Sequence, residues 1–207
     1  MSDNTENNKR IAKNTLLLYA RMLLMMLVSL FTSRVILQVL GIEDYGVYNV
    51  VGGIVSMFAF INGGMVAATQ RYITFELGSG NKERLQRVFS TSLQIHAMIS
   101  ILIVILGETV GLWFLQEKLV IPEDRMIAAM WVYQCSIIVC VLNIMSIPYN
   151  ADIVAHEKMS AFAMISVVEV VLKLLVVYLL MLFPFDKLIV YAILLLAVQF
   201  SIRLVYA

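Results

Sequence analysis

Long apolar stretches, separated by short polar connections, run along most of the chain. Six of them reach the roughly 20 residues that a helix needs to cross the hydrocarbon core of a bilayer. We expect these spans at about residues 15–40, 45–75, 88–115, 126–147, 159–183 and 187–207. The pattern therefore predicts an all-α fold, a polytopic membrane bundle of six transmembrane helices.

The connections between the predicted spans are short and rich in turn-forming residues. They fall at residues 41–44, 78–81, 116–124 and 150–158. They leave no room for a catalytic domain outside the membrane, and neither HExxH nor a Gly-rich phosphate loop appears. We therefore expect a protein that is not an enzyme and that holds no metal or cofactor.

Lysine and arginine are divided unevenly between the two ends of the predicted bundle. The richer end holds Lys9, Arg10, Lys13, Arg71, Lys82, Arg84, Arg87, Lys158 and Arg203, whereas the other holds Lys118, Arg125 and Lys187. The positive-inside rule places the richer end, and with it both ends of this chain, in the cytoplasm. The first apolar stretch is too long for a signal-peptide core, so we interpret it as a spanning helix.

The composition agrees with a membrane protein. Hydrophobic residues make up 61% of the chain and charged residues 14%, whereas soluble domains are about 45–50% apolar and about 25% charged. The net charge of +1 predicts no nucleic-acid partner. Cys135 and Cys140 lack the spacing of metal ligands, and we interpret them as small buried side chains.

Two charged residues lie inside the fifth predicted span. Glu169 and Lys173 are four residues apart, so they project from one helix face and can form an ion pair. They continue a face that also carries Phe162 and Ser166. Counted from the cytoplasmic end, Glu169 should lie about 15 Å deep, near the midplane. Such a pair either pins two helices together or lines a polar cavity, and intramembrane ionisable groups favour the second role.

Arg34 is a third candidate for the cavity, and three further residues are secondary candidates for the site. Arg34 lies in the outer part of the first span, where it either meets a cavity or extends to the interface. Arg71 lies at the cytoplasmic end of the second span, near phosphate head groups. Glu108 lies near the outer end of the third span, and Asn143 shares a face of the fourth with Ser136. Asn143 is suited to a hydrogen bond between helices.

Small residues form two stripes in the predicted helices. On the second span, Asn49, Gly53, Ser56, Gly63, Gly64 and Ala67 fall near one face, and on the third span Gly107 and Gly111 are four residues apart. Small residues at this spacing let membrane helices approach closely. We interpret both stripes as helix-packing faces, with bending during transport as the alternative.

Several short motifs together resemble those of a known transporter family. They lie at residues 13–16, 34–41, 41–48, 64–73, 78–81, 147–151 and 155–158. With these motifs the whole chain resembles the polysaccharide-biosynthesis flippases, the O-antigen and capsule transporters of the multidrug/oligosaccharidyl-lipid/polysaccharide exporter superfamily, in a Bacteroides-type branch. The last two motifs carry the resemblance to that branch.

The resemblance implies a protein of the bacterial inner membrane with two lobes around a cavity that opens alternately to each side. Its substrate would be an oligosaccharide linked to polyprenyl pyrophosphate, and its partners would be membrane lipids and other polysaccharide-assembly proteins. Arg34 and Lys173 would meet the anionic head group. Glu169 would tune Lys173 or exchange a coupling cation, a proton or sodium. Because the chain stops at residue 207 without a polar tail, we expect it to be the N-terminal lobe alone.

Two alternatives stay open. A cation-coupled multidrug or small-molecule antiporter of the same superfamily would use Glu169 as its cation-binding carboxylate. A membrane polysaccharide polymerase or ligase would need a long external loop with paired Arg or His residues. The longest external loop here, residues 116–124, is short and lacks such a pair.

Overall fold

The computed structural model describes residues 2–182 and 186–206, and the side-chain surroundings of residues 12–58, 62–182 and 186–204. Residues 183–185 and 207, which belong to the ends of the last two predicted spans and the loop between them, lie outside this part. The helices are α1 (Ser2–Ser56), α2 (Phe60–Ser79), α3 (Lys82–Leu106), α4 (Leu112–Glu117), α5 (Met126–Ala155), α6 (Met159–Leu182) and α7 (Lys187–Tyr206). Within the described residues there is no strand, which confirms an all-α membrane helix bundle.

Five helical stretches are long and apolar enough to cross a membrane. They are Ala12–Ser56, Lys82–Glu117, Glu123–Ala155, Met159–Leu182 and Lys187–Leu204. The first of them contains a kink at Gly41, where the backbone has φ 82° and ψ 172°, a conformation that is almost confined to glycine. The first connection is therefore tighter than the predicted loop of residues 41–44, because the helix resumes directly after Gly41.

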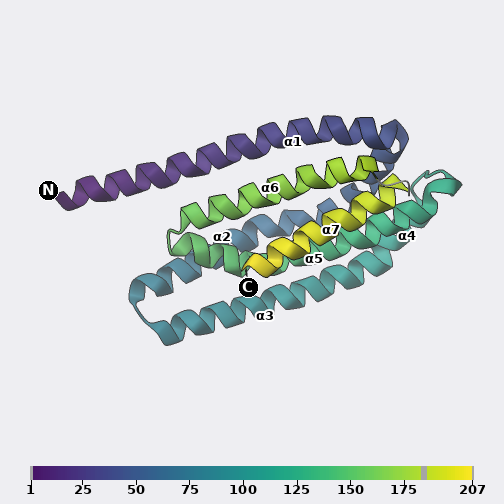
Figure 1. Cartoon of the computed structure of the whole chain (residues 1–207). Coiled ribbons are helices and arrows are strands. Elements are labelled where there is room, and N and C mark those ends of the chain that lie inside the picture. The colour runs from purple at the N-terminus through teal and green to yellow at the C-terminus, as the bar shows by residue number, and fades with distance from the viewer. Residues whose placement is uncertain (1, 183–185, 207) are drawn as a thin grey trace.

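The second predicted span, residues 45–75, is not one continuous helix. It consists of the end of α1, a 3₁₀ turn at Met57–Ala59, and most of α2. Helix α2 is absent from the five long apolar stretches found among the described residues, because it carries polar residues such as Gln70, Arg71 and Glu76. Figure 1 shows α1 turning back at one end of the bundle, so that α2 runs beneath it.

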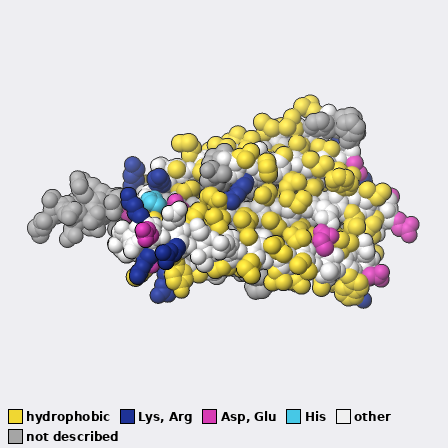
Figure 2. All heavy atoms as spheres, turned by 90° about the horizontal axis from the view of Figure 1, so that it is seen from below, with side chains coloured by type: hydrophobic (Ala, Val, Ile, Leu, Met, Phe, Trp, Pro, Cys, Tyr) yellow, Lys and Arg dark blue, Asp and Glu magenta, His cyan; other side chains and the backbone are white. Residues whose placement is uncertain are grey.

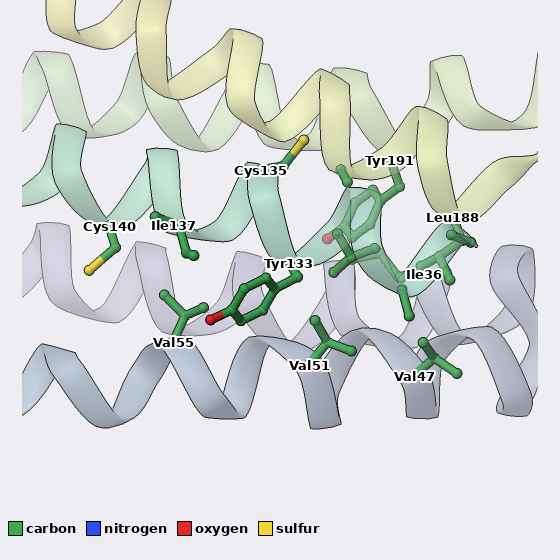
Figure 3. Close-up of a cluster of buried hydrophobic side chains, with 14 of the residues drawn as sticks. Ile36, Val47, Val51, Val55, Tyr133, Cys135, Ile137, Cys140, Leu188 and Tyr191 are labelled. Carbon is green, nitrogen blue, oxygen red and sulfur yellow. The ribbon is translucent and has the colours of Figure 1, made fainter. Parts of the chain in front are cut away.

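Helix α5 lies at the centre of the bundle. It packs against α1, α2, α3, α6 and α7, and α3 forms the edge of the bundle farthest from the first part of α1 (Figure 1). Figure 3 shows Tyr133 pointing from α5 toward Val51 and Val55 of α1. All three side chains are buried, so this side of α5 forms the apolar core.

A close glycine contact joins the third predicted span to α5. The span is interrupted by a π-helical turn at Gly107–Gly111, and the Tyr133 hydroxyl donates a hydrogen bond of 2.7 Å to the Gly107 carbonyl. A Cβ atom at Gly111 would overlap that hydroxyl, and one at Gly107 would lie 2.8 Å from Ile137 Cδ1. The two glycines therefore serve the close helix approach that their spacing predicts.

The predicted loop at residues 150–158 is wrong for most of its length. Helix α5 continues through Pro148 to Ala155, because a membrane helix tolerates proline where neighbouring groups satisfy the freed carbonyl. The helix ends with two 3.0 Å hydrogen bonds, from the Glu157 N–H to the Val154 carbonyl and from the Lys158 N–H to the Ile153 carbonyl. With Glu157 at φ 54°, this is a Schellman cap, a pattern that usually has glycine at this position.

An arginine joins three elements at the end of the bundle where α1 turns. Arg125, at the start of α5, has its Nε 3.1 Å from Asp44 Oδ1 and its Nη1 3.0 Å from Asp186 Oδ2. Asp186 also accepts the N–H of Leu188 at 3.0 Å, and so caps the first turn of α7. These contacts hold α1, α5 and α7 together beside the cavity described below.

The outer surface is apolar over most of its length. Leu16, Leu27, Met98 and Leu182 are about two-thirds or more exposed, at 70%, 68%, 71% and 78%. Such a surface suits contact with lipid, since soluble proteins rarely expose large apolar patches. Figure 2 shows lysine and arginine gathered toward one end of the visible face and most of the acidic side chains toward the other.

Candidate functional site: a cavity between α1, α5, α6 and α7

A cavity of about 600 Å³ lies where α1, α5, α6 and α7 meet. Its polar lining comes from Ser29, Thr32, Ser33, Tyr45, Tyr48, Asn49, Ser56, Asn62, Ser136, Asn143, Lys173, Tyr191 and Gln199. Lys173 is the one charged residue among the described residues that line it. The volume falls within the range of small-molecule sites, and its polar character is unusual for space between apolar helices.

The charged pair on α6 stands at the wall of this cavity. Lys173 Nζ donates to Glu169 Oε1 at 2.7 Å, and the side chains are 36% and 21% exposed. Gln199 Nε2, on α7, donates to the same carboxylate oxygen at 3.1 Å. Lys173 and Gln199 both line the cavity, whereas Glu169 contacts both of them and is not itself among the lining residues. The pair is therefore partly accessible, and it links α6 to α7.

The rest of the polar face of α6 contacts α1. Arg21 Nε donates to Ser166 Oγ at 2.6 Å, and the Arg21 guanidinium lies 4.2 Å from the centre of the Phe162 ring. Arg21 is therefore held between helices rather than extending freely to the interface. The face that carries Phe162, Ser166, Glu169 and Lys173 thus contacts two different helices along its length.

Aromatic and amide side chains form the side of the cavity near the Gly41 turn. The rings of Tyr48 and Tyr191 meet edge to face, with their centres 5.0 Å apart. Asn49 Nδ2 donates to the Tyr45 carbonyl at 2.7 Å, which leaves its side-chain oxygen as an acceptor. Rings and amides in one pocket provide both stacking surfaces and hydrogen-bonding groups.

Two polar atoms at the cavity wall have no partner within the described part of the chain. They are Thr32 Oγ1 and Asn62 Oδ1, and both are buried. Buried polar groups are normally hydrogen-bonded, because leaving one unsatisfied costs about 1–3 kcal/mol. Together with Lys173, these atoms make the cavity suited to a polar ligand or to ordered water.

Comparison with known proteins identifies the family. The chain matches the MatE family model over residues 18–179, which is most of its length. The chain belongs to the MatE family. No curated protein matches it, and no solved structure does so.

Membership of the MatE family makes this chain a membrane transporter of the multidrug/oligosaccharidyl-lipid/polysaccharide exporter superfamily. The superfamily predicted from the sequence motifs is therefore confirmed. The narrower assignments, to polysaccharide flippases and to a Bacteroides-type branch, stay predictions.

The structure brings some predicted site residues of this MatE protein together and separates others. Lys173 and Asn143 line the cavity, and Glu169 is paired with Lys173. Arg34 is exposed and is not among the lining residues, although its neighbours Ser33 and Ile36 are.

Two secondary candidates lie elsewhere in the MatE bundle. Arg71 is exposed on α2. Glu108 is exposed in the π-helical turn, where it accepts a hydrogen bond of 3.2 Å from Gln134 Nε2. Within the described residues, no three His, Cys, Asp or Glu side chains are grouped closely enough to hold a metal ion.

The sequence interpretation missed Gln199, Tyr48 and Tyr191. Gln199 carried a usable signal, because it is an isolated amide in the middle of the last apolar stretch. The tyrosines carried none, since an aromatic residue near a helix end is equally typical of the membrane interface. Only the packing of α1 against α7 shows that they meet at the cavity.

Proposed function

We propose that this MatE protein flips an oligosaccharide linked to polyprenyl pyrophosphate across the inner membrane by alternating access. The observation that supports this proposal most strongly is the cation at the cavity wall. Lys173 is the charged residue of the described lining, and its side chain is partly accessible. A cavity with a single accessible ammonium group favours an anionic substrate.

The physical requirement is set by the pyrophosphate. An unpaired charge in hydrocarbon is costly, so the head group needs cations and water along its route. Lys173 is paired with Glu169 at rest. A pyrophosphate in the cavity would compete with Glu169 for the ammonium group, while Gln199 keeps donating to the carboxylate. The pair would then open when substrate arrives and close when it leaves.

The remaining lining suits the sugar part of such a substrate. Sugars present many hydroxyl groups and one less polar face. Asn49, Asn62 and Asn143 offer donors and acceptors, and Tyr45 and Tyr48 offer ring surfaces. The polyprenyl chain would stay in the surrounding lipid, against the exposed apolar face of α1.

The setting that we propose follows from the same assignment. The protein would lie in a bacterial inner membrane with both ends of this chain in the cytoplasm, as one lobe of a two-lobed transporter. It would act without catalysis and without a cofactor, coupled to a proton or sodium gradient through Glu169. Other polysaccharide-assembly proteins would supply and receive its substrate.

One observation favours a cation-coupled multidrug antiporter as the second candidate. Three tyrosine rings line the cavity, and aromatic rings attract organic cations. Glu169 would provide the carboxylate that binds the coupling ion. In that case Lys173 would serve only as the ion-pair partner of Glu169 and would not contact the substrate.

The experiment compares two functions in one set of strains. The chromosomal gene is replaced by a gene for one of three variants, Lys173→Ala, Lys173→Arg or the loop variant Lys118→Ala. Protein amounts are checked by immunoblot. We expect Lys173→Ala to lose most surface polysaccharide, Lys173→Arg to keep part of it, and Lys118→Ala to match the parent strain. Unchanged polysaccharide in Lys173→Ala, with lost resistance to cationic dyes, would replace the flippase proposal by the antiporter.

A further inference from the structure

A second cavity, of about 390 Å³, lies between α2 and α3, away from the central one. Most of its lining surface is apolar and comes from residues such as Met65, Ala68 and Tyr72 of α2 and Val88 and Ile95 of α3. Tyr72 is 62% exposed and Ile95 is 50% exposed, so the cavity is a groove that opens at the surface of the bundle. We call it the α2–α3 groove.

The buried polar side chains at the base of the groove turn toward one another. Thr69 Oγ1 and Ser92 Oγ lie 3.4 Å apart. His96 Nδ1 donates to the Ser92 carbonyl at 2.6 Å, which leaves Nε2 as the acceptor of a neutral ring. That Nε2 is buried and has no partner within the described residues. The polar groups of Thr69, Ser92 and His96 therefore lie at the buried base of the groove, and the apolar lining lies between this base and the surface.

The mouth of the groove is cationic. Arg87 lines it, and no described residue forms an ion pair or side-chain hydrogen bond with the guanidinium group. Arg84 and Lys82 precede it on α3, and both are exposed. Arg87 comes nine residues before His96, so the groove extends about 14 Å along α3. One end of the groove thus offers an unpaired cation, and its length is apolar.

We propose that the α2–α3 groove binds one anionic phospholipid from the cytoplasmic leaflet. The phosphate contacts Arg87, and one acyl chain lies along Tyr72, Ile95 and Met65. Thr91 lines the groove about one turn below Arg87, where its hydroxyl can donate to the ester carbonyl of the lipid. Basic pockets between helices on the cytoplasmic side are the usual form of such lipid sites.

The surroundings of the groove favour a lipid over a protein partner. The adjacent outer face of α3 exposes Met98 and Ile101 at 71% and 61%, as a helix in contact with hydrocarbon does. Figure 1 places α3 at the edge of the bundle, and Figure 2 shows an apolar surface with basic side chains concentrated toward one end. An acyl chain with an anionic head matches both the apolar length and the basic mouth.

The test uses the purified chain in a neutral detergent and native mass spectrometry with phosphatidylglycerol and phosphatidylcholine. We expect phosphatidylglycerol to bind at least tenfold more tightly than phosphatidylcholine. Arg87→Gln should remove that preference, and Arg84→Gln, which changes a neighbouring cation outside the lining, should keep it. Ala68→Trp, which fills the groove, should weaken binding at least tenfold, and excess inorganic phosphate should not displace the lipid.

Three results would overturn the proposal. Equal affinity of the parent and Arg87→Gln for phosphatidylglycerol would show that the head group binds elsewhere. Full binding of phosphatidylglycerol to a folded Ala68→Trp variant would show that surface charge attracts the lipid and that the lipid does not enter the groove. If Ala68→Trp does not fold, Tyr72→Ala at the exposed mouth repeats the test. A dimer of the parent that Ala68→Trp abolishes, with lipid binding unchanged, would assign the groove to a second copy of the chain.

Discussion

Two regions with the same small residues have opposite roles in this bundle. Gly107 and Gly111 lie against α5, so close that a Cβ atom at either would meet Ile137 or Tyr133. Gly52 and Gly53 of α1 have no heavy atom within 4 Å of an added Cβ, and Gly52 lines the central cavity. The spacing of small residues therefore indicates a close approach or an open space equally well.

The difference comes from the opposing helix. Tyr133 is completely buried, and its hydroxyl is satisfied by the Gly107 carbonyl, so that side of α5 fills the space that the glycines leave. At the cavity, Tyr48 and Tyr191 pack against each other instead. Thr32 Oγ1 and Asn62 Oδ1, which also line this cavity, have no hydrogen-bond partner within the described residues. One side of α5 is thus fixed by packing, and the other remains available to a ligand.

The largest expected effect is that of Gly111→Ala. The new methyl group would collide with the Tyr133 hydroxyl, and overpacking of this kind costs about 1–3 kcal/mol. We expect a loss of about 3 kcal/mol in the free energy of unfolding, measured by titration with sodium dodecyl sulfate. The matched variant Gly53→Ala should be neutral or stabilising by up to about 1 kcal/mol, because alanine favours helix. Equal losses for the two variants would remove the distinction between the regions.

A smaller effect is expected for Glu169→Gln. It leaves the Lys173 ammonium beside a neutral amide in a partly exposed position. We expect a loss of about 1–2 kcal/mol in the free energy of unfolding. Lys173→Met in the same chain removes the unpaired charge, so the double variant should regain most of that stability. A double variant that loses as much stability as the two single changes added together would show that Glu169 and Lys173 do not stabilise each other.

The smallest effect is expected for Tyr133→Phe. The variant keeps the ring and removes only the 2.7 Å hydrogen bond to the Gly107 carbonyl. Hydrogen bonds between membrane helices average about 0.6 kcal/mol, and we expect a loss of that size. Combined with Gly111→Ala, the same change should relieve part of the clash. Thermal unfolding of the parent and the three variants in detergent gives the coupling. Strict additivity would show that the hydroxyl is not what Gly111 accommodates.

The helices could be predicted from the sequence because long apolar stretches have few alternatives in a membrane. Their interruptions could not. Gly41 reverses the chain alone, whereas four residues had been assigned to that turn. The pattern predicts that the fourth span ends near residue 147, yet α5 continues through Pro148 to Ala155. At Pro148 the local rule that proline ends a helix does not hold, because neighbouring groups in a membrane bundle can satisfy the freed carbonyl.

The candidate site was partly predictable for a different reason. Glu169 and Lys173 are costly in hydrocarbon, so their presence was itself a signal, and the structure places Lys173 at the cavity. Arg34 gave the same signal, but it lies on the exposed side of α1. Charge identifies a candidate, whereas the direction of the side chain depends on which helices pack together. Tyr48 and Tyr191 required that packing to be known.

The most direct test is the affinity of the purified protein for polyprenyl pyrophosphate, with Lys173 varied. We predict that Lys173→Ala raises the dissociation constant at least tenfold, about 1.4 kcal/mol of binding free energy, and that Lys173→Arg stays close to the parent. Arg34→Ala, which changes a cation outside the described lining, should leave the constant unchanged. An unchanged dissociation constant in a folded Lys173→Ala variant would contradict a role for this cation in holding the substrate.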